Sequence, residues 1–170
     1  MNKTNSPNTS RNPPKLTPEL SKFVENFGRY FESYGIPHIG GRILGLLLVA
    51  HEPLSAESIS ATLKVSRASV STNLRFALHV GLAEKTSFPG DRTTYYVFPE
   101  TGLEKTLSIE IQGLGVMKRL AEQGLAALPP GDAARSRMEA MIQWADFLIQ
   151  IWQKALIEWR ERQGLQSAVR

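Results

Sequence analysis

A single change of periodicity, at Gly81, limits the folds that this chain can adopt. Before Gly81, apolar residues recur at steps of three and four, as they do on amphipathic helices. After it come the short runs LAEKTSF and TTYYVF, rich in residues that favour strands, with PGDR between them. Pro89 and Gly90 suit the two central positions of a type II turn. The pattern therefore predicts helices followed directly by a β-hairpin.

Capping residues delimit the helices that precede this hairpin. Ser55 can cap a short helix that ends before a tight turn at residues 64–65. Ser66 can cap the next helix, which has an apolar face and ends at Gly81. An apolar helix at about residues 41–50 comes before both and is expected to be central. Helix, short helix, turn, capped helix and hairpin is the order of a winged helix-turn-helix.

Longer helices are predicted on both sides of this core. One begins at Pro18, with Thr17 as its cap, and stops at Gly35. Its apolar stripe consists of Leu20, Phe23, Val24, Phe27, Tyr30, Phe31 and Tyr34. Beyond residue 100 we expect helices at residues 101–128 and 133–163, broken by the sequence PPGD. The expected fold class is mainly α with a small β-hairpin.

Composition argues against several classes of protein. The 170 residues include no cysteine, and the three histidines are not at metal-ligand spacing, so no metal site is expected. The sequence has no paired-carboxylate motif, glycine-rich phosphate loop or nucleophile with a nearby base, so neither an enzyme nor a cofactor is expected. The N-terminus is polar, and the longest apolar run, residues 43–50, is too short to span a membrane. We expect a cytoplasmic protein.

Positive charge is concentrated where the helix-turn-helix is predicted. The formal charge of the whole chain is +4, and residues 60–99 carry five basic and two acidic residues, a net of +3. Residues 1–17 add three basic residues and no acidic one. This distribution suggests double-stranded DNA as a partner. A solvated basic face is the alternative.

The helix that begins after Ser66 has the features of a DNA-reading helix. Val70, Leu74 and Leu78 can face the core and leave the opposite side free. Small and hydrogen-bonding residues near the helix start can reach base edges in the major groove, whereas Arg75, farther along, is better placed for phosphate. The candidate DNA-binding residues on this helix are Ser66, Arg67, Ala68, Ser69, Thr72, Asn73 and Arg75. The alternative is an ordinary solvated surface.

The predicted hairpin carries a further candidate, Arg92, at its tip. A long cation there can enter a narrow minor groove or contact phosphate. Asp91 would repel DNA, so we expect it either to brace Arg92 or to cap the turn. A turn that serves only solubility is the alternative.

Three motifs resemble the MarR-type (multiple antibiotic resistance) regulators, and in particular the branch with glycine-betaine and choline synthesis repressors. They are GRILGLLL, the spaced pattern in SRASVSTNLR, and PGDR, and the resemblance covers roughly residues 20–100. It implies a homodimer whose interface is made by the first and last helices. It also implies a cleft, between the interface and the DNA-binding lobe, where a small-molecule effector binds.

The C-terminal helix independently predicts a partner. Its apolar stripe runs from Met138 to Trp159 over several turns, more than a small winged helix can cover. Pairing with a second subunit would solve this and would predict a palindromic operator. The candidate effector residues are Phe27, Tyr30, Phe31, Tyr34 and Trp144. They suggest an aromatic cage for a quaternary ammonium group, with plain core or interface as the alternative.

Together these patterns predict a sequence-specific DNA-binding transcription regulator, a homodimeric repressor that a small molecule releases from a palindromic operator. The expected divisions are a basic tail at residues 1–17, a dimerisation helix at 18–36, a winged helix-turn-helix DNA-binding domain at 37–100 and a helical dimerisation region at 101–165. The alternative is a winged-helix module for protein interaction without DNA binding. Arg67, Arg75 and Arg92 favour DNA.

Overall fold

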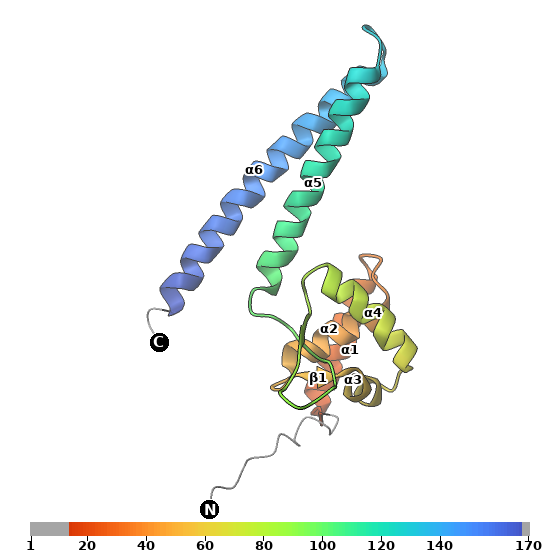
Figure 1. Ribbon diagram of the computed structural model, residues 1–170, viewed down its shortest axis with the longest axis vertical. Helices are drawn as coiled ribbons and strands as arrows, with labels where there is room; N and C mark the ends of the chain where they lie inside the picture. Colours follow the sequence, from red (N-terminus) through yellow and green to blue (C-terminus); the bar gives the residue numbers. More distant parts are fainter. Residues whose placement is uncertain (1–13, 168–170) are drawn as a thin grey trace, which may run out of the picture. The chain divides into compact units, whose positions relative to one another are not determined.

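The computed structural model describes residues 14–167 and divides into two compact units that meet between residues 103 and 104. The first unit contains the predicted helix-turn-helix, and the second is a pair of long helices (Figure 1). Residues 1–13 of the predicted basic tail lie outside the described residues. The expected fold class, mainly α with a small β element, is confirmed.

The first unit contains four helices and three short strands in its described part. The elements are α1 (Pro18–Glu32), α2 (His38–Val49), β1 (Leu54–Ser55), α3 (Ala56–Leu63), α4 (Arg67–His79), β2 (Glu84–Thr86) and β3 (Tyr95–Val97). Two helix boundaries differ from the prediction: α1 ends at Glu32, before Tyr34 of its predicted stripe, and α2 begins at His38, three residues before the expected start. Pro37 directly precedes it, and a proline at this point costs no helical hydrogen bond because the first backbone N–H groups of a helix have no partner within it.

The predicted caps hold the starts of three helices. The Thr17 hydroxyl accepts a hydrogen bond from the Leu20 backbone N–H at 3.2 Å, at the start of α1. At the start of α3, the Ser55 hydroxyl accepts a hydrogen bond from the Ser58 N–H at 3.0 Å, and at the start of α4 the Ser66 hydroxyl accepts one from the Ser69 N–H at 3.2 Å. Each cap satisfies a donor that would otherwise have no partner within the helix.

The hairpin predicted after Gly81 is present, and a third strand extends it. β2 and β3 pair antiparallel, and β1 pairs with the other edge of β3, so the strand order is β1-β3-β2. Sequence analysis missed β1 because it is two residues long and Ser55 is also the cap of α3. Leu54 faces Tyr96 across this pairing, which joins the hairpin to the helices.

α2 lies at the centre of the core of the first unit. Ile43, Leu44 and Leu46 are almost fully buried, and the side chains of α1, α3 and α4 pack around them. α1 and α2 pack very closely at Gly41. A Cβ atom added there would lie 2.8 Å from the Gly28 Cα and 2.9 Å from the Phe27 carbonyl oxygen. Real Cβ atoms do not approach other atoms so closely, so glycine is required at position 41.

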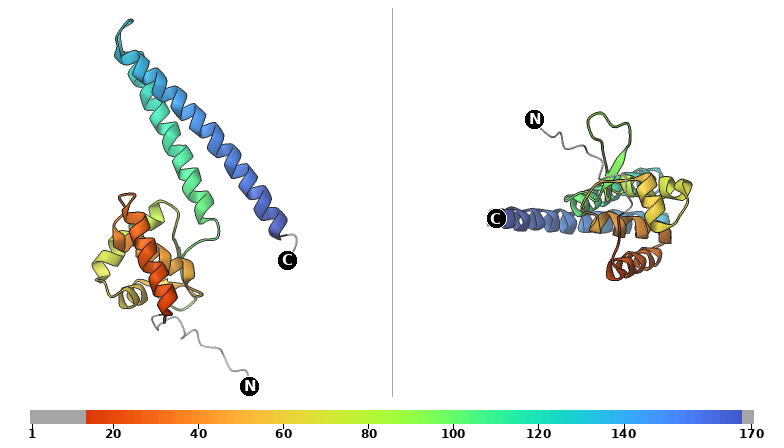
Figure 2. Two further views of the ribbon diagram at one scale, coloured as in Figure 1. Left: turned by 180° about the vertical axis from the view of Figure 1, so that it is seen from behind. Right: turned by 90° about the horizontal axis from the view of Figure 1, so that it is seen from below.

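The second unit is an antiparallel pair of helices, α5 (Gly102–Ala127) and α6 (Ala134–Ser167) (Figures 1 and 2). Arg135 donates hydrogen bonds to the carbonyl oxygens of Leu125 and Leu128. Carbonyl groups at the end of a helix such as α5 lack partners within the helix, and Arg135 supplies one. An ion pair of 2.6 Å between the Lys118 ammonium and the Asp146 carboxylate connects the two helices. α6 extends four residues past the predicted end at residue 163. Within residues 14–167, no helix is both long and apolar enough to cross a membrane.

The close contact between α1 and α2 gives a stability prediction. Gly41→Ala should lower the free energy of unfolding by about 1–3 kcal/mol, the usual cost of overpacking. Gly113→Ala is the matched control, since no heavy atom lies within 4 Å of its Cβ position on α5. That control should raise the free energy of unfolding by about 0.5–1 kcal/mol. Denaturant unfolding followed by circular dichroism measures both, and equal effects would contradict the close helix contact.

Candidate nucleic-acid interface

α4 separates a buried face from an exposed one, as its sequence predicted. Val70, Leu74 and Ala77 are at most 1% exposed and anchor the helix on α2 and α3. On the other side, Ser66, Arg67, Ala68, Thr72 and Arg75 are exposed and Ser69 is partly exposed. The first turn of α4 is therefore accessible, with its free backbone N–H groups and two small side chains.

The polar residues farther along this exposed face interact with one another. A guanidinium nitrogen of Arg75 lies 3.4 Å from the Thr72 hydroxyl, within the limits of a weak hydrogen bond. Both side chains are exposed, so this contact orients Arg75 along the outer surface without burying it. A cation oriented in this way, beyond the first turn, suits contact with a phosphate.

Asn73 does not belong to the exposed surface where the sequence analysis placed it. Its side chain is 9% exposed, and its amide donates a hydrogen bond of 2.9 Å to the Ser69 carbonyl oxygen. Its amide oxygen lies where α4 meets α2, only 2.8 Å from the position that a Cβ atom would take at Gly40. The polar residue type suggested an outward side chain, but the missing side chain at Gly40 leaves room for it inside.

Four exposed residues were missed. Ser71, Phe76 and His79 also face outward on α4, and Lys64 is exposed in the turn that precedes it. The step of four from Ala68 and Thr72 leads to Phe76, so helical periodicity would have found it. Lys64 adopts φ +55, a left-handed conformation that is unfavourable for a residue with a side chain. No sequence signal indicated that conformation.

The tip of the hairpin is held by Asp91. The Asp91 backbone N–H donates to the Phe88 carbonyl oxygen, and Gly90 has φ +79, as a type II turn requires. The Asp91 carboxylate accepts hydrogen bonds from the Thr93 N–H at 2.8 Å and from the Tyr95 hydroxyl at 2.7 Å. These contacts support turn capping, one of the two roles considered for Asp91. Arg92 is exposed beside this turn.

The candidate effector residues lie on α1, in the turn after it and on α6. A continuous series of ring contacts, with centroids 5.0–6.3 Å apart, joins Phe27, Tyr30 and Phe31 of α1 to Tyr34 in the turn that follows. Tyr30 and Tyr34 are 54% and 69% exposed, and the pKa of Tyr30 is raised because its side chain hydrogen bonds with Tyr34. Trp144 lies on α6 in the second unit, where its ring neighbours Phe147.

The geometry defines a winged helix-turn-helix protein in which the first turn of α4 is accessible. The family model of the MmpR5-like MarR family transcriptional regulators matches residues 102–162. The HTH-type transcriptional regulator MmpR5 of Mycobacterium tuberculosis is 34% identical over 132 residues, which cover 77% of this chain and 79% of the relative. A solved structure described as that of a transcriptional regulator shares 31% identity, with a TM-score of 0.78 over 85% of this chain and 99% of the other. The chain therefore belongs to the MarR family of transcriptional regulators, which are DNA-binding proteins and not enzymes.

Neighbouring residues of the hairpin allow a matched stability test. Asp91→Ala should lower the free energy of unfolding by about 1–3 kcal/mol, because it removes two hydrogen bonds and leaves the buried Tyr95 hydroxyl without this partner. Arg92→Ala should change it by no more than about 0.5 kcal/mol, as exposed substitutions usually do. Thermal unfolding of both variants measures the difference. A larger loss for Arg92→Ala would mean that the cation, and not the carboxylate, stabilises the turn.

Proposed function

We propose that this regulator reads double-stranded DNA in a sequence-specific manner with α4 and the β2–β3 hairpin, as a homodimeric repressor. The observation that carries the proposal is the exposed N-terminal half of α4, held in place by a fully buried opposite face. In helix-turn-helix proteins this part of the reading helix meets base edges in the major groove. Because the inner face is fixed, the outer side chains are presented in a defined register.

The roles of individual residues follow from their size and place. Ala68 and Ser69 are small enough for the helix to approach the bases closely, and Arg67 can donate two hydrogen bonds to guanine. Ser66 and the free N–H groups of the first turn favour a nearby phosphate. Thr72 lies one turn farther along the same face. Asn73 is left out of this set because it is buried.

The two remaining arginines are proposed to bind the DNA backbone and the minor groove. Arg75 lies along Thr72 on the outer surface, beyond the reach of the first turn, and suits a phosphate. Arg92 stands exposed beside a turn whose own hydrogen bonds are made by Asp91. Since Asp91 makes these hydrogen bonds, the Arg92 side chain can enter a narrow minor groove or contact a phosphate.

A second copy of the chain is proposed as the partner of the second unit. In the described part of that unit, the buried apolar residues are Ala121, Ala145 and Leu156, a small core for two long helices. Large apolar side chains remain exposed on α5 and α6, and these are Leu103, Val116, Leu120, Met141, Trp144, Phe147, Ile151, Ile157 and Trp159. Exposed apolar helix faces of this extent are usually buried against another protein surface. A twofold dimer, with α1 and the C-terminal helices in its interface, would bind a palindromic operator.

A small-molecule effector is the further part of this proposal. The exposed tyrosine pair at the end of α1, Tyr30 and Tyr34, offers aromatic faces that can attract a cation. The narrower resemblance to glycine-betaine and choline repressors would make that cation a quaternary ammonium compound. The same rings would equally serve a dimer interface, and titration of such a compound into the full-length protein with DNA would separate the two roles.

Use as a protein-interaction module without DNA binding is not favoured, because Arg67, Arg75 and Arg92 are all exposed on the surface that would meet DNA. Random-sequence duplex DNA tests this alternative. DNA binding predicts an affinity that falls steeply with salt, whereas an interaction module would show no such dependence.

Two arginine substitutions test the assignment of reading and phosphate contacts. Operators are first selected from a random DNA pool with the full-length protein. Arg67→Ala should then cost about 1–3 kcal/mol on the selected operator and flatten the preference at one base position per half-site. Arg75→Ala should weaken all sequences about equally and make the salt slope shallower by about one unit. An unchanged base preference in Arg67→Ala would remove that residue from the reading set.

The proposed dimer can be tested on the exposed face of α6. Trp144→Glu should raise the dimer dissociation constant about tenfold or more, because it places a carboxylate without a partner in an apolar interface. Gln143→Glu is the control, since it introduces the same charge at the neighbouring exposed position. Light scattering across a concentration series measures both. A Trp144→Glu dimer as stable as the control would place the interface elsewhere.

A further inference from the structure

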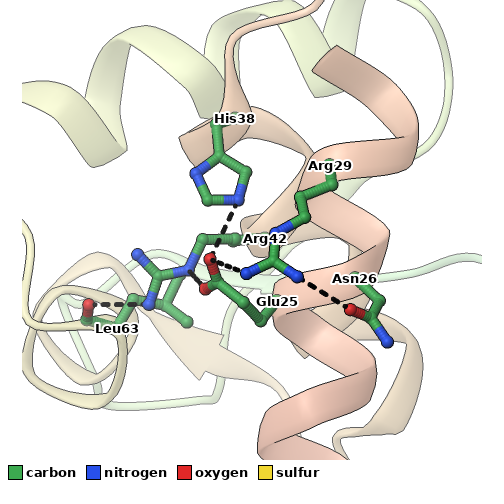
Figure 3. Close-up of polar contacts among 6 residues, drawn as sticks. All are labelled: Glu25, Asn26, Arg29, His38, Arg42 and Leu63. Carbon is green, nitrogen blue, oxygen red and sulfur yellow. Dashed lines mark hydrogen bonds and ion pairs between the residues drawn. The ribbon is translucent and has the colours of Figure 1, made fainter. Parts of the chain in front are cut away.

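One guanidinium group joins three helices of the first unit. Arg42 on α2 places its Nε atom 3.1 Å from a carboxylate oxygen of Glu25 on α1 (Figure 3). A terminal nitrogen of the same group donates a hydrogen bond of 3.1 Å to the Leu63 carbonyl oxygen at the end of α3. We call this arrangement, Glu25–Arg42–Leu63, the clasp.

The clasp ends at the turn that leads into α4. Leu63 is the last residue of α3, and Lys64 after it takes the left-handed conformation. Val65 closes the turn, because its N–H donates to the Ser60 carbonyl oxygen while the Ser60 hydroxyl donates to the Val65 carbonyl oxygen. Ser66, the next residue, caps α4. The Leu63 carbonyl held by Arg42 is therefore three residues before the cap of α4.

Burial makes Glu25 important to the clasp. The Arg42 Nε atom and the His38 Nε2 atom are both shielded from solvent, and neither has a well-aligned hydrogen bond. The carboxylate of Glu25 faces both nitrogen atoms, at 3.1 and 3.2 Å. Removing it would leave buried donors without a counter-charge, which is costly. Arginine suits this place because its planar fork reaches two acceptors at once, whereas a lysine ammonium is a single point.

Gly28 on α1 gives these side chains their space. A Cβ atom at this position would lie 2.5 Å from the His38 ring and 2.7 Å from the Arg42 Cγ atom. Both side chains therefore run directly against the backbone of α1 to reach Glu25. The clasp therefore depends on the absence of a side chain at Gly28, which lets Arg42 cross the backbone of α1.

We propose that Arg42 is a positioning residue for DNA recognition, which holds the α3–α4 turn against α1 through the clasp and so sets where the reading helix begins. This inference rests on the proposed reading role of α4. Arg42 itself does not meet DNA, because its side chain is only 23% exposed and its guanidinium already faces Glu25 and Leu63. Its removal should alter the register of the first turn of α4 and leave the exposed cations in place.

Arg29 supplies a matched control. It lies one turn after Glu25 on α1, and its side chain is 68% exposed. Its contacts are an ion pair of 3.9 Å with Glu25 and a hydrogen bond to the Asn26 side chain, both within α1. Arg29→Met removes the same charge from the same neighbourhood without touching the turn.

The experiment measures affinity for a selected operator and for a random duplex, across salt concentrations, with full-length Arg42→Met, Arg42→Lys, Glu25→Gln and Arg29→Met. We expect Arg42→Met to lose about tenfold on the operator and less than about twofold on random DNA, with an unchanged salt slope. Arg42→Lys should not restore the loss, because one ammonium cannot reach both acceptors. Glu25→Gln should show part of the loss, and the double variant of Glu25 and Arg42 should be no worse than Arg42→Met. Arg29→Met should bind as the unaltered protein does.

Amide hydrogen exchange is the second measurement, and it does not depend on DNA. In Glu25→Gln, the mildest variant, exchange of the Val65 amide should quicken while amides within α5 and α6 stay unchanged. Unchanged exchange at Val65, or full operator affinity in a folded Arg42→Met, would overturn the proposal. An equal loss of affinity for the operator and for random DNA in Arg42→Met, with a salt slope shallower by about one unit, would also overturn the proposal. It would mean that Arg42 contacts a phosphate. If the unaltered protein shows no operator preference, the proposed DNA reading fails, while the exchange result still decides the role of the clasp.

Discussion

The contact between the backbones of α1 and α2 at Gly28 and Gly41 is the constraint on which the first unit depends. The two helices approach so closely that neither position can carry a side chain without a shift of its neighbours. This approach lets Phe27 pack over Gly45 and brings Glu25 within 3.2 Å of polar atoms on α2. With α1 pressed on one side of it and α4 on another, α2 is buried nearly all round. The apolar sequence of α2 suits this burial, because a polar face would have no contact with water.

Features fixed by local chemistry could be predicted from the sequence. A hydroxyl at Thr17, Ser55 or Ser66 satisfies a backbone donor three residues later, so each helix start follows from a few neighbouring residues. The turn at Pro89 and Gly90 is equally local, because the two residues restrict their own backbone angles. Two of the three motifs of the MarR resemblance, SRASVSTNLR and PGDR, contain such local signals, and the third, GRILGLLL, is the apolar sequence of α2. Family and fold class were accordingly within reach of the sequence.

Features fixed by tertiary contact were out of reach. β1 exists only because β3 offers it a partner, and two residues carry no periodicity. Asn73 faces inward because Gly40, on another helix, leaves it room, so its polarity was a misleading signal. Arg42 meets Leu63 only once the crossing of α1 on α2 and the end of α3 are known. Each case depends on residues far apart in the chain, and a single sequence gives no register between them.

Polar residues in the first unit divide into those that hold the structure and those that remain available. Asn73, Asp91 and Arg42 are each engaged with the backbone of the same unit, at Ser69, Thr93 and Leu63. Arg67, two residues before Ser69, and Arg92, directly after Asp91, are exposed. Substitution of an exposed side chain usually costs the fold little, whereas loss of a buried hydrogen bond costs more. Under the proposed function, DNA preference can therefore change through the exposed residues while the anchors keep α4 and the hairpin in place.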